Sequence, residues 1–261
     1  MNAYEKLKTA RRNGRPLGSD YINAMITERL DLCGDRRFAE DSAIVAGIGL
    51  LGDVPVTYIA IDKGHDLNER VKKNFGCVKP EGYRTALRLM KEAEKFRRPV
   101  ICFVDTLGAF PGADGEERGQ GQAIAENIME MMGLKTPVIS VIIGEGGSGG
   151  ALALASASKV YMLENAVYSV ITPEGCASIL YKDAGRVAEA AEALRITAQD
   201  MVDQGVAEEI IPENFDDFPA MCADITARLL ADIDAMSSLS GEEIVQNRYA
   251  RFRRIGAYTE V

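Results

Sequence analysis

The stretch that decides the fold runs from residue 136 to residue 163 and reads TPVISVIIGEGGSGGALALASASKVYML. An apolar run rich in Val and Ile comes first, and five glycines follow within the seven residues 144–150. Small residues then continue to about Ser158, and a second apolar run covers residues 160–163. Continuous apolar runs of this kind are typical of strands that are buried on both faces. The stretch therefore predicts a strand, a glycine-rich turn, a short helix over about residues 151–158 and a second strand.

Two earlier stretches repeat its beginning. VPVTYIAIDKG (54–64) and RPVICFVDTLG (98–108) share with TPVISVIIGEG (136–146) the order x-Pro-Val, apolar run and glycine. A proline at the first residue of a strand removes no hydrogen bond that the sheet needs. Apolar residues recur at helical spacing over residues 83–96 and 116–132, which lie between the copies. Strand, turn and helix in this repeated order predict an α/β fold with largely parallel strands and right-handed crossovers.

The remaining chain continues the same pattern. A strand is expected over residues 167–171, a helix over 192–203 ended by Gly205, a short strand over 206–211 and an amphipathic helix over 219–236. No stretch resembles an interdomain linker, so we expect a helical N-terminal arm (1–19) followed by one domain (20–261). The basic segments 6–15 and 248–254 are expected to be solvated surface, the alternative being a docking site for an acidic partner.

Composition excludes several classes of function. The 261 residues carry a net charge of −9, which disfavours nucleic acid as a partner. No apolar run approaches the roughly 20 residues that span a bilayer, and the N-terminus lacks the apolar core of a signal peptide. Five isolated cysteines and one histidine, His65, disfavour a disulfide framework and a metal site in this chain. We therefore expect a cytoplasmic protein with no membrane contact.

The two glycine-rich turns, DTLGAFPGADGEERG (105–119) and GEGGSGG (144–150), each follow one of the repeated strands. A glycine turn that opens a helix leaves free N–H groups, and together with the helix dipole these favour negative charge. The charge is either a phosphate or an oxyanion formed during acyl or carboxyl transfer. Gly144, Gly146 and Gly149 also spell G-x-G-x-x-G, with Glu164 20 residues after the first, which outlines a dinucleotide site. A third interpretation is that small residues only let the helix pack closely on the sheet.

Side chains offer fewer possibilities. Ser148 lies between glycines, but a serine hydrolase would need His65 as its base. Asp105 follows an apolar strand and is expected to cap the following turn. Acidic residues at a helix start, such as Glu116 and Glu117, are favoured by the dipole without any catalytic role. The other polar candidates are Asp114, Glu145, Glu174 and Lys182. From the residues alone, oxyanion stabilisation is favoured but not decided.

Five longer motifs occur in order along most of the chain: NFG (74–76) with PEGYRTALRLMKEAE (80–94), DTLGAFPG (105–112), RGQGQAIAEN (118–127), GEGGSGGALAL (144–154) and SVITPEGCASIL (169–180). Together they resemble the carboxyltransferase α subunit of bacterial acetyl-CoA carboxylase. The resemblance implies a crotonase-like (ClpP/crotonase) fold, a spiral of repeated ββα units, which would explain the repeated strands. It also implies carboxyl transfer from carboxybiotin to acetyl-CoA, which yields malonyl-CoA for fatty acid biosynthesis.

The resemblance further implies several partners. These are a β subunit that carries a zinc ribbon, in an α₂β₂ heterotetramer, a biotin carboxyl carrier protein, and a biotin carboxylase that uses ATP. The biotin would thus be held by a separate carrier protein, and this chain would hold no metal. Carried over by position, Gly149 and Gly150 would supply the backbone oxyanion hole for carboxybiotin. The implied substrate-binding residues are Gly108, Phe110, Pro111, Gly112, Gly146, Gly147, Pro173, Glu174 and Gly175.

Three departures from the family pattern concern the site and its surroundings. Leu107 stands where the family usually has proline, which we expect to loosen the turn that follows. Residues 63–67, which include His65, carry fewer positive charges than usual, and the N-terminal arm looks shorter. The residues leave other acyl-CoA carboxyltransferases, a biotin-dependent decarboxylase component and a non-catalytic scaffold for the β subunit as alternatives within the family.

Overall fold

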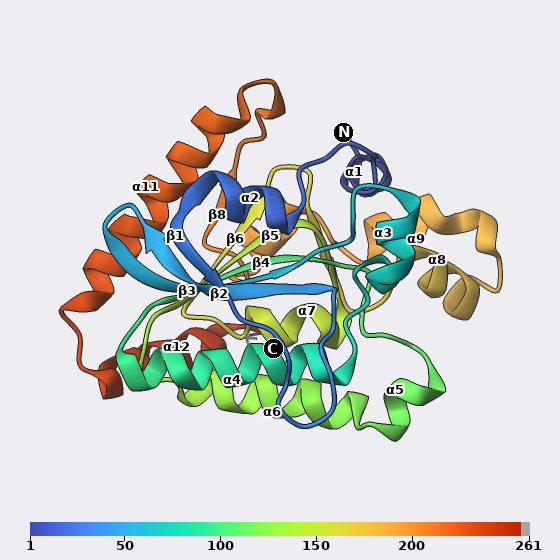
Figure 1. Ribbon diagram of the computed structural model, residues 1–261. Coiled ribbons are helices and arrows are strands. Elements are labelled where there is room, and N and C mark those ends of the chain that lie inside the picture. The colour runs from blue at the N-terminus through green and yellow to red at the C-terminus, as the bar shows by residue number, and fades with distance from the viewer. Residues whose placement is uncertain (257–261) are drawn as a thin grey trace.

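The computed structural model describes residues 1–256, so the last five residues of the expected domain lie outside the described part. A single eight-stranded sheet forms its centre (Figure 1), with the order β1-β2-β3-β4-β5-β6-β8 and with β7 paired to the end of β5. The strands are β1 Ile26–Asp31, β2 Ile44–Leu51, β3 Val54–Ile61, β4 Val100–Thr106, β5 Val138–Gly147, β6 Lys159–Leu163, β7 Val167–Ser169 and β8 Glu209–Ile211.

The three repeated stretches become the neighbouring strands β3, β4 and β5, which confirms the α/β prediction. They pair in parallel, as do β6 and β8 beyond them, whereas β1, β2 and β3 are antiparallel. Every residue of β4 is buried, and β5 is buried up to its last residue. Their Val- and Ile-rich sequences are continuous because both faces of the sheet are covered.

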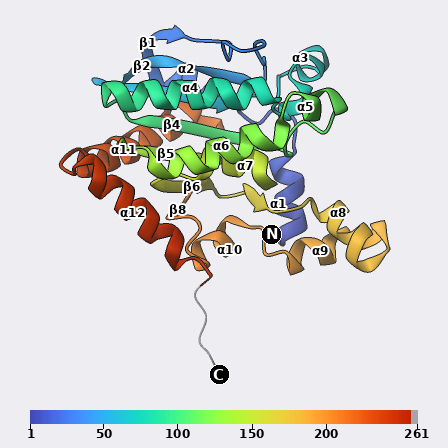
Figure 2. The same cartoon turned by 90° about the horizontal axis from the view of Figure 1, so that it is seen from below.

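Helices cover the two faces (Figures 1 and 2). On one face α4 Pro80–Phe96 packs against β2 and β3 and against α6 Gln120–Gly133, and α7 Ser148–Ala155 packs between α6 and the strands β4 and β5. On the other face α2 Gly18–Met25 contacts β3 and β4 and also α11 Phe218–Ser237. The remaining helices are α1 Ala3–Ala10, α3 Leu67–Lys72, α5 Ala113–Glu117, α8 Pro173–Cys176, α9 Val187–Ala193, α10 Ala198–Asp203 and α12 Gly241–Arg254.

Two predicted helices are interrupted in the structure. Arg195 adopts a left-handed backbone (φ +50°), so the segment 192–203 is not one helix. The helix α10 begins after Thr197, whose hydroxyl oxygen caps it by accepting from the Asp200 N–H. Gly119, with φ +83°, separates α5 from α6 inside the predicted helix 116–132. A single left-handed residue is enough to end a helix, and arginine carries no signal for it.

The basic terminal segments are not simply solvated surface, and that expectation is wrong for three arginines. Arg15 forms an ion pair of 2.7 Å with Glu213, and both side chains are buried. Arg251 is buried and pairs with Glu208 at 2.6 Å. Arg248 is 1% exposed, and its guanidinium donates to Ser158 Oγ and to the carbonyls of Met131, Met132, Leu134 and Thr136.

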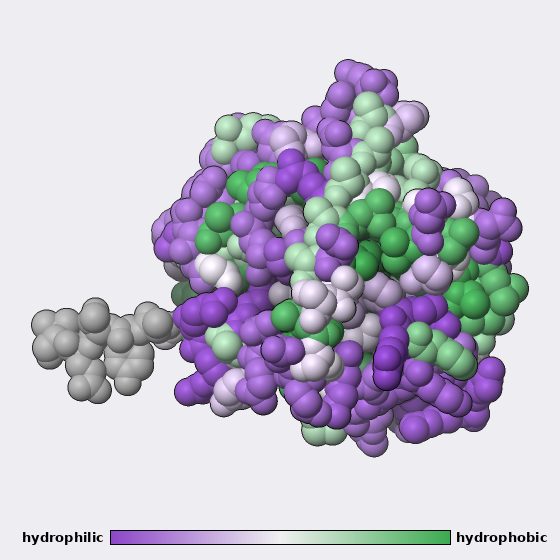
Figure 3. Space-filling model, turned by 90° about the vertical axis from the view of Figure 1, so that its left-hand side faces the viewer, coloured by the Kyte–Doolittle hydropathy of each residue, from purple (hydrophilic) through white to green (hydrophobic). Residues whose placement is uncertain are grey.

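The surface of the molecule is mostly polar. On the face shown in Figure 3 hydrophilic residues predominate, and apolar residues form separate patches between them. Within residues 1–256, no helix is both long enough and apolar enough to cross a bilayer.

Candidate functional site

The glycine-rich turn 146–150 joins the end of β5 to the start of α7. Gly147 is the N-cap residue of α7, and in the described part of the chain no side chain caps the first N–H groups of the helix. Ser148 has φ +50°, so the chain reverses sharply there, and its side chain is exposed. Gly149 and Gly150 lie in the first helical turn, where N–H groups have no acceptor within the helix. The turn therefore presents free donors at the positive end of a helix.

A second backbone segment, residues 107–109 after β4, lies directly against this turn. A Cβ atom on Gly147 would come within 2.1 Å of the Leu107 carbonyl oxygen, and one on Gly150 within 2.8 Å of the Ala109 nitrogen. Contacts this short do not occur in proteins, so the two segments can approach only because these residues are glycines. Within residues 1–256, the Ala109 N–H has no hydrogen-bond partner, whereas the N–H of Phe110 donates to the Val78 carbonyl at 3.1 Å. Ala109 is thus a further free donor, which sequence reasoning missed because a backbone N–H leaves no mark on residue type.

Two side chains, those of Thr106 and Tyr83, contact the segments 107–109 and 146–150. The Thr106 hydroxyl donates to the Gly76 carbonyl at 2.7 Å and accepts from the Gly108 N–H at 3.0 Å. These two hydrogen bonds tie the turn to the backbone at Gly76, beside Leu107, the residue that we expect to loosen it. The Tyr83 hydroxyl is buried and has no hydrogen-bond partner among residues 1–256, and it lies 2.8 Å from the point where a Cβ of Gly150 would be. Burial raises the pKa of Tyr83, so its hydroxyl stays protonated.

The other residues singled out from the sequence divide into two groups. Gly146, Gly147 and Pro173 line a small hollow beside the turn, together with Leu107, Ser148 and Thr172. Gly175 lies in α8, where its N–H donates to the Thr172 hydroxyl at 3.1 Å. Phe110, Pro111 and Gly112 continue the segment after Gly108 and line neither this hollow nor the larger cavity beside it. Gly112 begins α5, and a Cβ there would meet the Phe110 ring at 2.3 Å.

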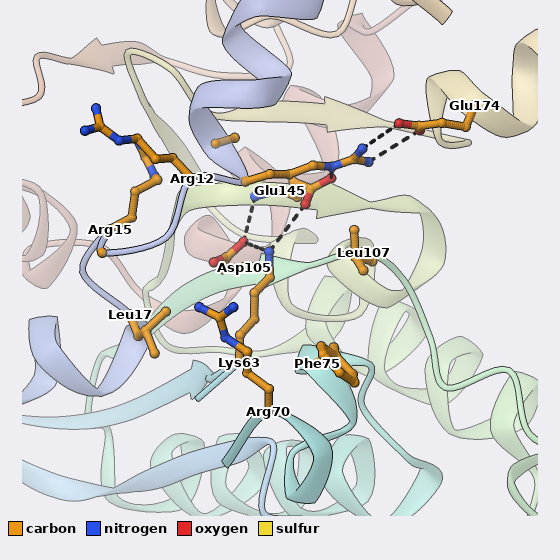
Figure 4. A pocket seen from close by; sticks show the side chains of 13 residues that line it. Arg12, Arg15, Leu17, Lys63, Arg70, Phe75, Asp105, Leu107, Glu145 and Glu174 are labelled. Atoms are coloured by element: carbon orange, nitrogen blue, oxygen red, sulfur yellow. Dashed lines mark hydrogen bonds and ion pairs between the residues drawn. The ribbon is translucent and has the colours of Figure 1, made fainter. Parts of the chain in front are cut away.

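A larger cavity of about 420 Å³ adjoins the hollow and shares Leu107 and Glu145 with it (Figure 4). A network of charges lines this cavity. Lys63 Nζ lies 2.6 Å from Asp105 Oδ1 and 3.5 Å from Glu145 Oε1. Arg11, from the N-terminal arm, bonds Glu145 at 2.9 Å and Glu174 at 2.6 Å. Lys63, Asp105 and Glu145 come from the carboxyl ends of three parallel strands, where ligands bind in α/β sheets.

The charges in this network compensate one another. Burial lowers the pKa of Lys63, but Asp105 and Glu145 outweigh it, so the pKa lies above its ordinary value and the ammonium stays charged. Burial likewise raises the pKa of Glu174, and the hydrogen bond and charge of Arg11 reverse the shift. Asp105 does not cap the turn after β4, contrary to the prediction. Its carboxylate accepts from the Glu145 N–H at 2.8 Å, on the neighbouring strand.

The alternative sites fit this geometry poorly. Gly144 lies within β5, and a Cβ there would be 2.3 Å from Asp105 Oδ1, so this glycine makes room for a carboxylate and does not form the tight turn of a dinucleotide site. His65 is exposed and lies 3.2 Å from Asp20, and it does not line the hollow beside Ser148. In the described residues, no group of three or more His, Cys, Asp or Glu side chains is arranged to hold a metal ion.

An apolar surface lies on the other side of the turn. A cavity of about 460 Å³ is lined by Ser148, Gly149 and Leu152 together with Tyr168, Val170, Met201 and Phe252. Three large apolar side chains nearby in sequence are exposed, namely Val170, Ile179 and Leu180. Monomeric proteins seldom expose such residues in groups.

Comparisons with known proteins agree with one another. Residues 1–256 match the family model described as acetyl co-enzyme A carboxylase carboxyltransferase-like. A protein of Ruminiclostridium cellulolyticum named acetyl-coenzyme A carboxylase carboxyl transferase subunit alpha is 54% identical over 260 residues, which cover all of both chains. A protein of the same name from Streptococcus equi subsp. zooepidemicus is 53% identical over 95% of this chain and 97% of its own.

Solved structures with the same fold share far less sequence. A transcarboxylase 12S structure, with methylmalonyl-coenzyme A and methylmalonic acid bound, aligns with a TM-score of 0.72 at 16% identity, over 88% of this chain and 42% of its own. A Pseudomonas malonate decarboxylase hetero-tetramer in complex with coenzyme A aligns at 0.70 and 16%, over 90% of this chain and 95% of its own. These likenesses confirm the crotonase-like fold that the sequence motifs predicted.

Proposed function

Because the chain belongs to the family of acetyl-CoA carboxylase carboxyltransferase alpha subunits, we propose that it completes, with a separate β subunit, the site that carboxylates acetyl-CoA. The carboxyl group is transferred from carboxybiotin on a biotin carboxyl carrier protein, and the product, malonyl-CoA, enters fatty acid biosynthesis. ATP is used by a separate biotin carboxylase, and this chain holds neither biotin nor a metal of its own. We place the reaction in the cytoplasm.

One observation carries the proposal: free backbone donors converge at the start of α7. The N–H groups of Gly149 and Gly150 lie in the first turn of α7, and Ala109, whose N–H is also free within residues 1–256, approaches Gly150 so closely that a Cβ there would be 2.8 Å from the Ala109 nitrogen. When bound, carboxybiotin would supply the activated carboxyl group and, once that group has left the biotin nitrogen, a base that takes a proton from the acyl-CoA before the new bond forms. The chain's own part is to hold negative charge on the oxygen where it develops. Each well-placed donor of this kind lowers a barrier by roughly 3 kcal/mol.

The surroundings of the turn supply the substrate contacts in this proposal. Gly146, Gly147 and Pro173 line the hollow, and the Gly108 nitrogen lies next to Gly147, 2.7 Å from the position that a Cβ there would take. Glu174, with Gly175 beside it, marks the border with the larger cavity. Phe110, Pro111 and Gly112 follow Gly108 along the same loop, and we propose that they contact the substrate from outside the hollow. No side-chain base is needed, which suits a chain whose single histidine, His65, is exposed and contacts Asp20.

The partner subunit is proposed to cover the apolar side of the turn. Val170, Ile179 and Leu180 are each more than 60% exposed, and Val170 also lines the apolar cavity beside Gly149. A β subunit with a zinc ribbon, in an α₂β₂ assembly, would bury these residues and bring a second set of donors to the site. We further propose that residues 1–19 act as an arm on a single domain of residues 20–261, since Arg11 and Arg15 attach the arm to Glu145 and Glu213.

The test measures carboxyl transfer from malonyl-CoA to biocytin, followed as loss of malonyl-CoA. The chain is assayed alone, with its cognate β subunit, and with that β subunit but with methylmalonyl-CoA in place of malonyl-CoA as the carboxyl donor. Activity that appears only in the mixture, and with malonyl-CoA preferred, is the expected result. An assembled complex that is inactive with malonyl-CoA would refute the proposed substrate, and activity with another acyl-CoA would replace it.

A further inference from the structure

An irregularity in the sheet lies just before the glycine turn. In the β4–β5 ladder Val104 pairs with Ile142, and the next pair is Thr106 with Gly146. Two residues along β4 therefore correspond to four along β5, so β5 bulges over residues 143–145. Bulges bend a strand and change the direction in which its side chains and its end point, and they are frequent beside active sites. This one determines where residues 146–150 leave the sheet.

Asp105 occupies the space that the bulge creates. Its Oδ1 accepts from the Glu145 N–H at 2.8 Å, a donor that the interrupted ladder cannot satisfy, and a Cβ on Gly144 would be 2.3 Å from the same oxygen. Asp105 is 6% exposed. Lys63 Nζ, 2.6 Å from that oxygen, balances its charge, as Figure 4 shows. A buried carboxylate that bonds a backbone donor and faces a cation is held in one geometry.

We propose that Asp105 is a positioning residue for the reaction: it fixes the bulge in β5 and so aims the N–H groups of Gly149 and Gly150. Gly146 and Gly147 carry no side chains and are held only by strand pairing, with Thr106 of β4 and with β7. Within residues 1–256, the last hydrogen bond from a side chain to this backbone before the turn is therefore the one that Asp105 accepts from the Glu145 N–H. The role of Lys63 is to keep Asp105 charged and in place. This inference rests on the proposed function of the turn, but it concerns residues that no part of that function uses.

The experiment compares two substitutions at this position in the complex with the β subunit. Asp105→Asn keeps an oxygen that can accept from the Glu145 N–H, whereas Asp105→Ala removes it. The matched control is Asp232→Ala, which removes a similarly buried carboxylate on α11 that lies 2.7 Å from Lys159 and bonds the Tyr161 hydroxyl of β6. Assembly is checked by size-exclusion chromatography, and kcat and KM for malonyl-CoA are measured separately.

A misplaced catalytic group costs about 10²-fold in rate, so Asp105→Ala is expected to lower kcat by about that factor with KM changed less than about threefold. Asp105→Asn is expected to retain more activity, with a loss of about tenfold, because the acceptor remains. Asp232→Ala is expected to lower thermal stability and to leave kcat unchanged. An assembled Asp105→Ala complex with wild-type kcat would overturn the inference. Equal losses of kcat in Asp105→Ala and Asp105→Asn, or a change confined to KM, would overturn it as well.

A second measurement does not depend on activity. Hydrogen–deuterium exchange of the segment 143–152 is expected to accelerate in Asp105→Ala, to change less in Asp105→Asn, and to stay at the wild-type rate in Asp232→Ala. Unchanged exchange in Asp105→Ala would refute the positioning role. If the wild-type complex has no carboxyltransferase activity, the proposed function fails, and the exchange rates still decide whether Asp105 fixes the turn.

Discussion

Replacing Gly150 by alanine adds one methyl group where the two backbone segments of the site meet. The new Cβ would lie 2.8 Å from three atoms: the Ala109 nitrogen, the Gly108 carbonyl carbon and the Tyr83 hydroxyl. Two of these belong to the backbone, so rotation of a side chain cannot relieve the contact. Ordinary contacts of a Cβ begin near 3.4 Å, so residues 108–109 must retreat from the turn by several tenths of an ångström. The retreat moves the Ala109 N–H, which is one of the donors proposed to hold the oxyanion.

Two magnitudes follow from this displacement. Overpacking a close contact costs about 1–3 kcal/mol of stability, which a chain of this size tolerates. Loss of one oxyanion donor lowers kcat by about 10²–10³-fold. We therefore expect Gly150→Ala to fold, to assemble with the β subunit and to lose about 10²-fold in kcat, with a much smaller change in KM.

The assay is malonyl-CoA loss with biocytin, combined with thermal unfolding of each variant. Gly121→Ala is the matched control, because this glycine is exposed on α6 and a Cβ there would meet nothing within 4 Å. It should raise stability by about 0.5–1 kcal/mol and leave activity unchanged. At Gly149 a Cβ would meet only Ile124 Cγ2, at 3.3 Å, so Gly149→Ala should lose less activity than Gly150→Ala. If assembled Gly150→Ala keeps wild-type kcat, the convergence of these two segments is not the catalytic feature.

Two further predictions concern the buried arginines. Arg248→Met should lower the free energy of unfolding by about 3 kcal/mol, because several buried carbonyls lose their donor. The control Arg253→Met, at an exposed position, should change the free energy of unfolding by less than about 0.5 kcal/mol. Thermal denaturation checks both. Glu213→Gln should cost about 3 kcal/mol near neutral pH, because it leaves Arg15 buried without its counter-ion. Burial raises the pKa of Glu213, but Arg15 and Asn165 lower it below its ordinary 4.5. The difference in the free energy of unfolding between wild type and Glu213→Gln should therefore shrink as the pH falls below about 4.5. A constant difference in denaturant titrations down to about pH 3 would contradict this.

Local patterns predicted the elements that local patterns control. The repeated x-Pro-Val runs became β3, β4 and β5, since apolar continuity reports burial on both faces. The break at Arg195 was missed because arginine has no preference for the left-handed backbone that it adopts there. The buried Arg248 was missed for a related reason, since arginine is mostly exposed and its partners are backbone carbonyls more than 100 residues away.

In the site, too, the sequence predicted the residues with a local signal and missed those that only distant contacts define. Gly149 and Gly150 could be singled out because glycine is itself the signal for a close backbone approach. Ala109 could not, because any residue offers an N–H, and only the fold shows which one is left unbonded. The charged network was also missed, since its members come from three different strands, and Asp105 was assigned a local capping role.

A positional signal for the network was nevertheless present. Lys63, Asp105 and Glu145 each follow the proline of one repeated stretch by six or eight residues, so parallel pairing of those stretches places all three at one edge of the sheet. Their charges then have to compensate, because two carboxylates and one ammonium are buried together. Arg11 supplies the second cation, and it comes from the N-terminal arm. The arm therefore contributes to the charge balance of the network beside the glycine turn. Removing the arm would take Arg11 away from Glu145, and Glu145 is also the residue whose N–H bonds Asp105 in the bulge.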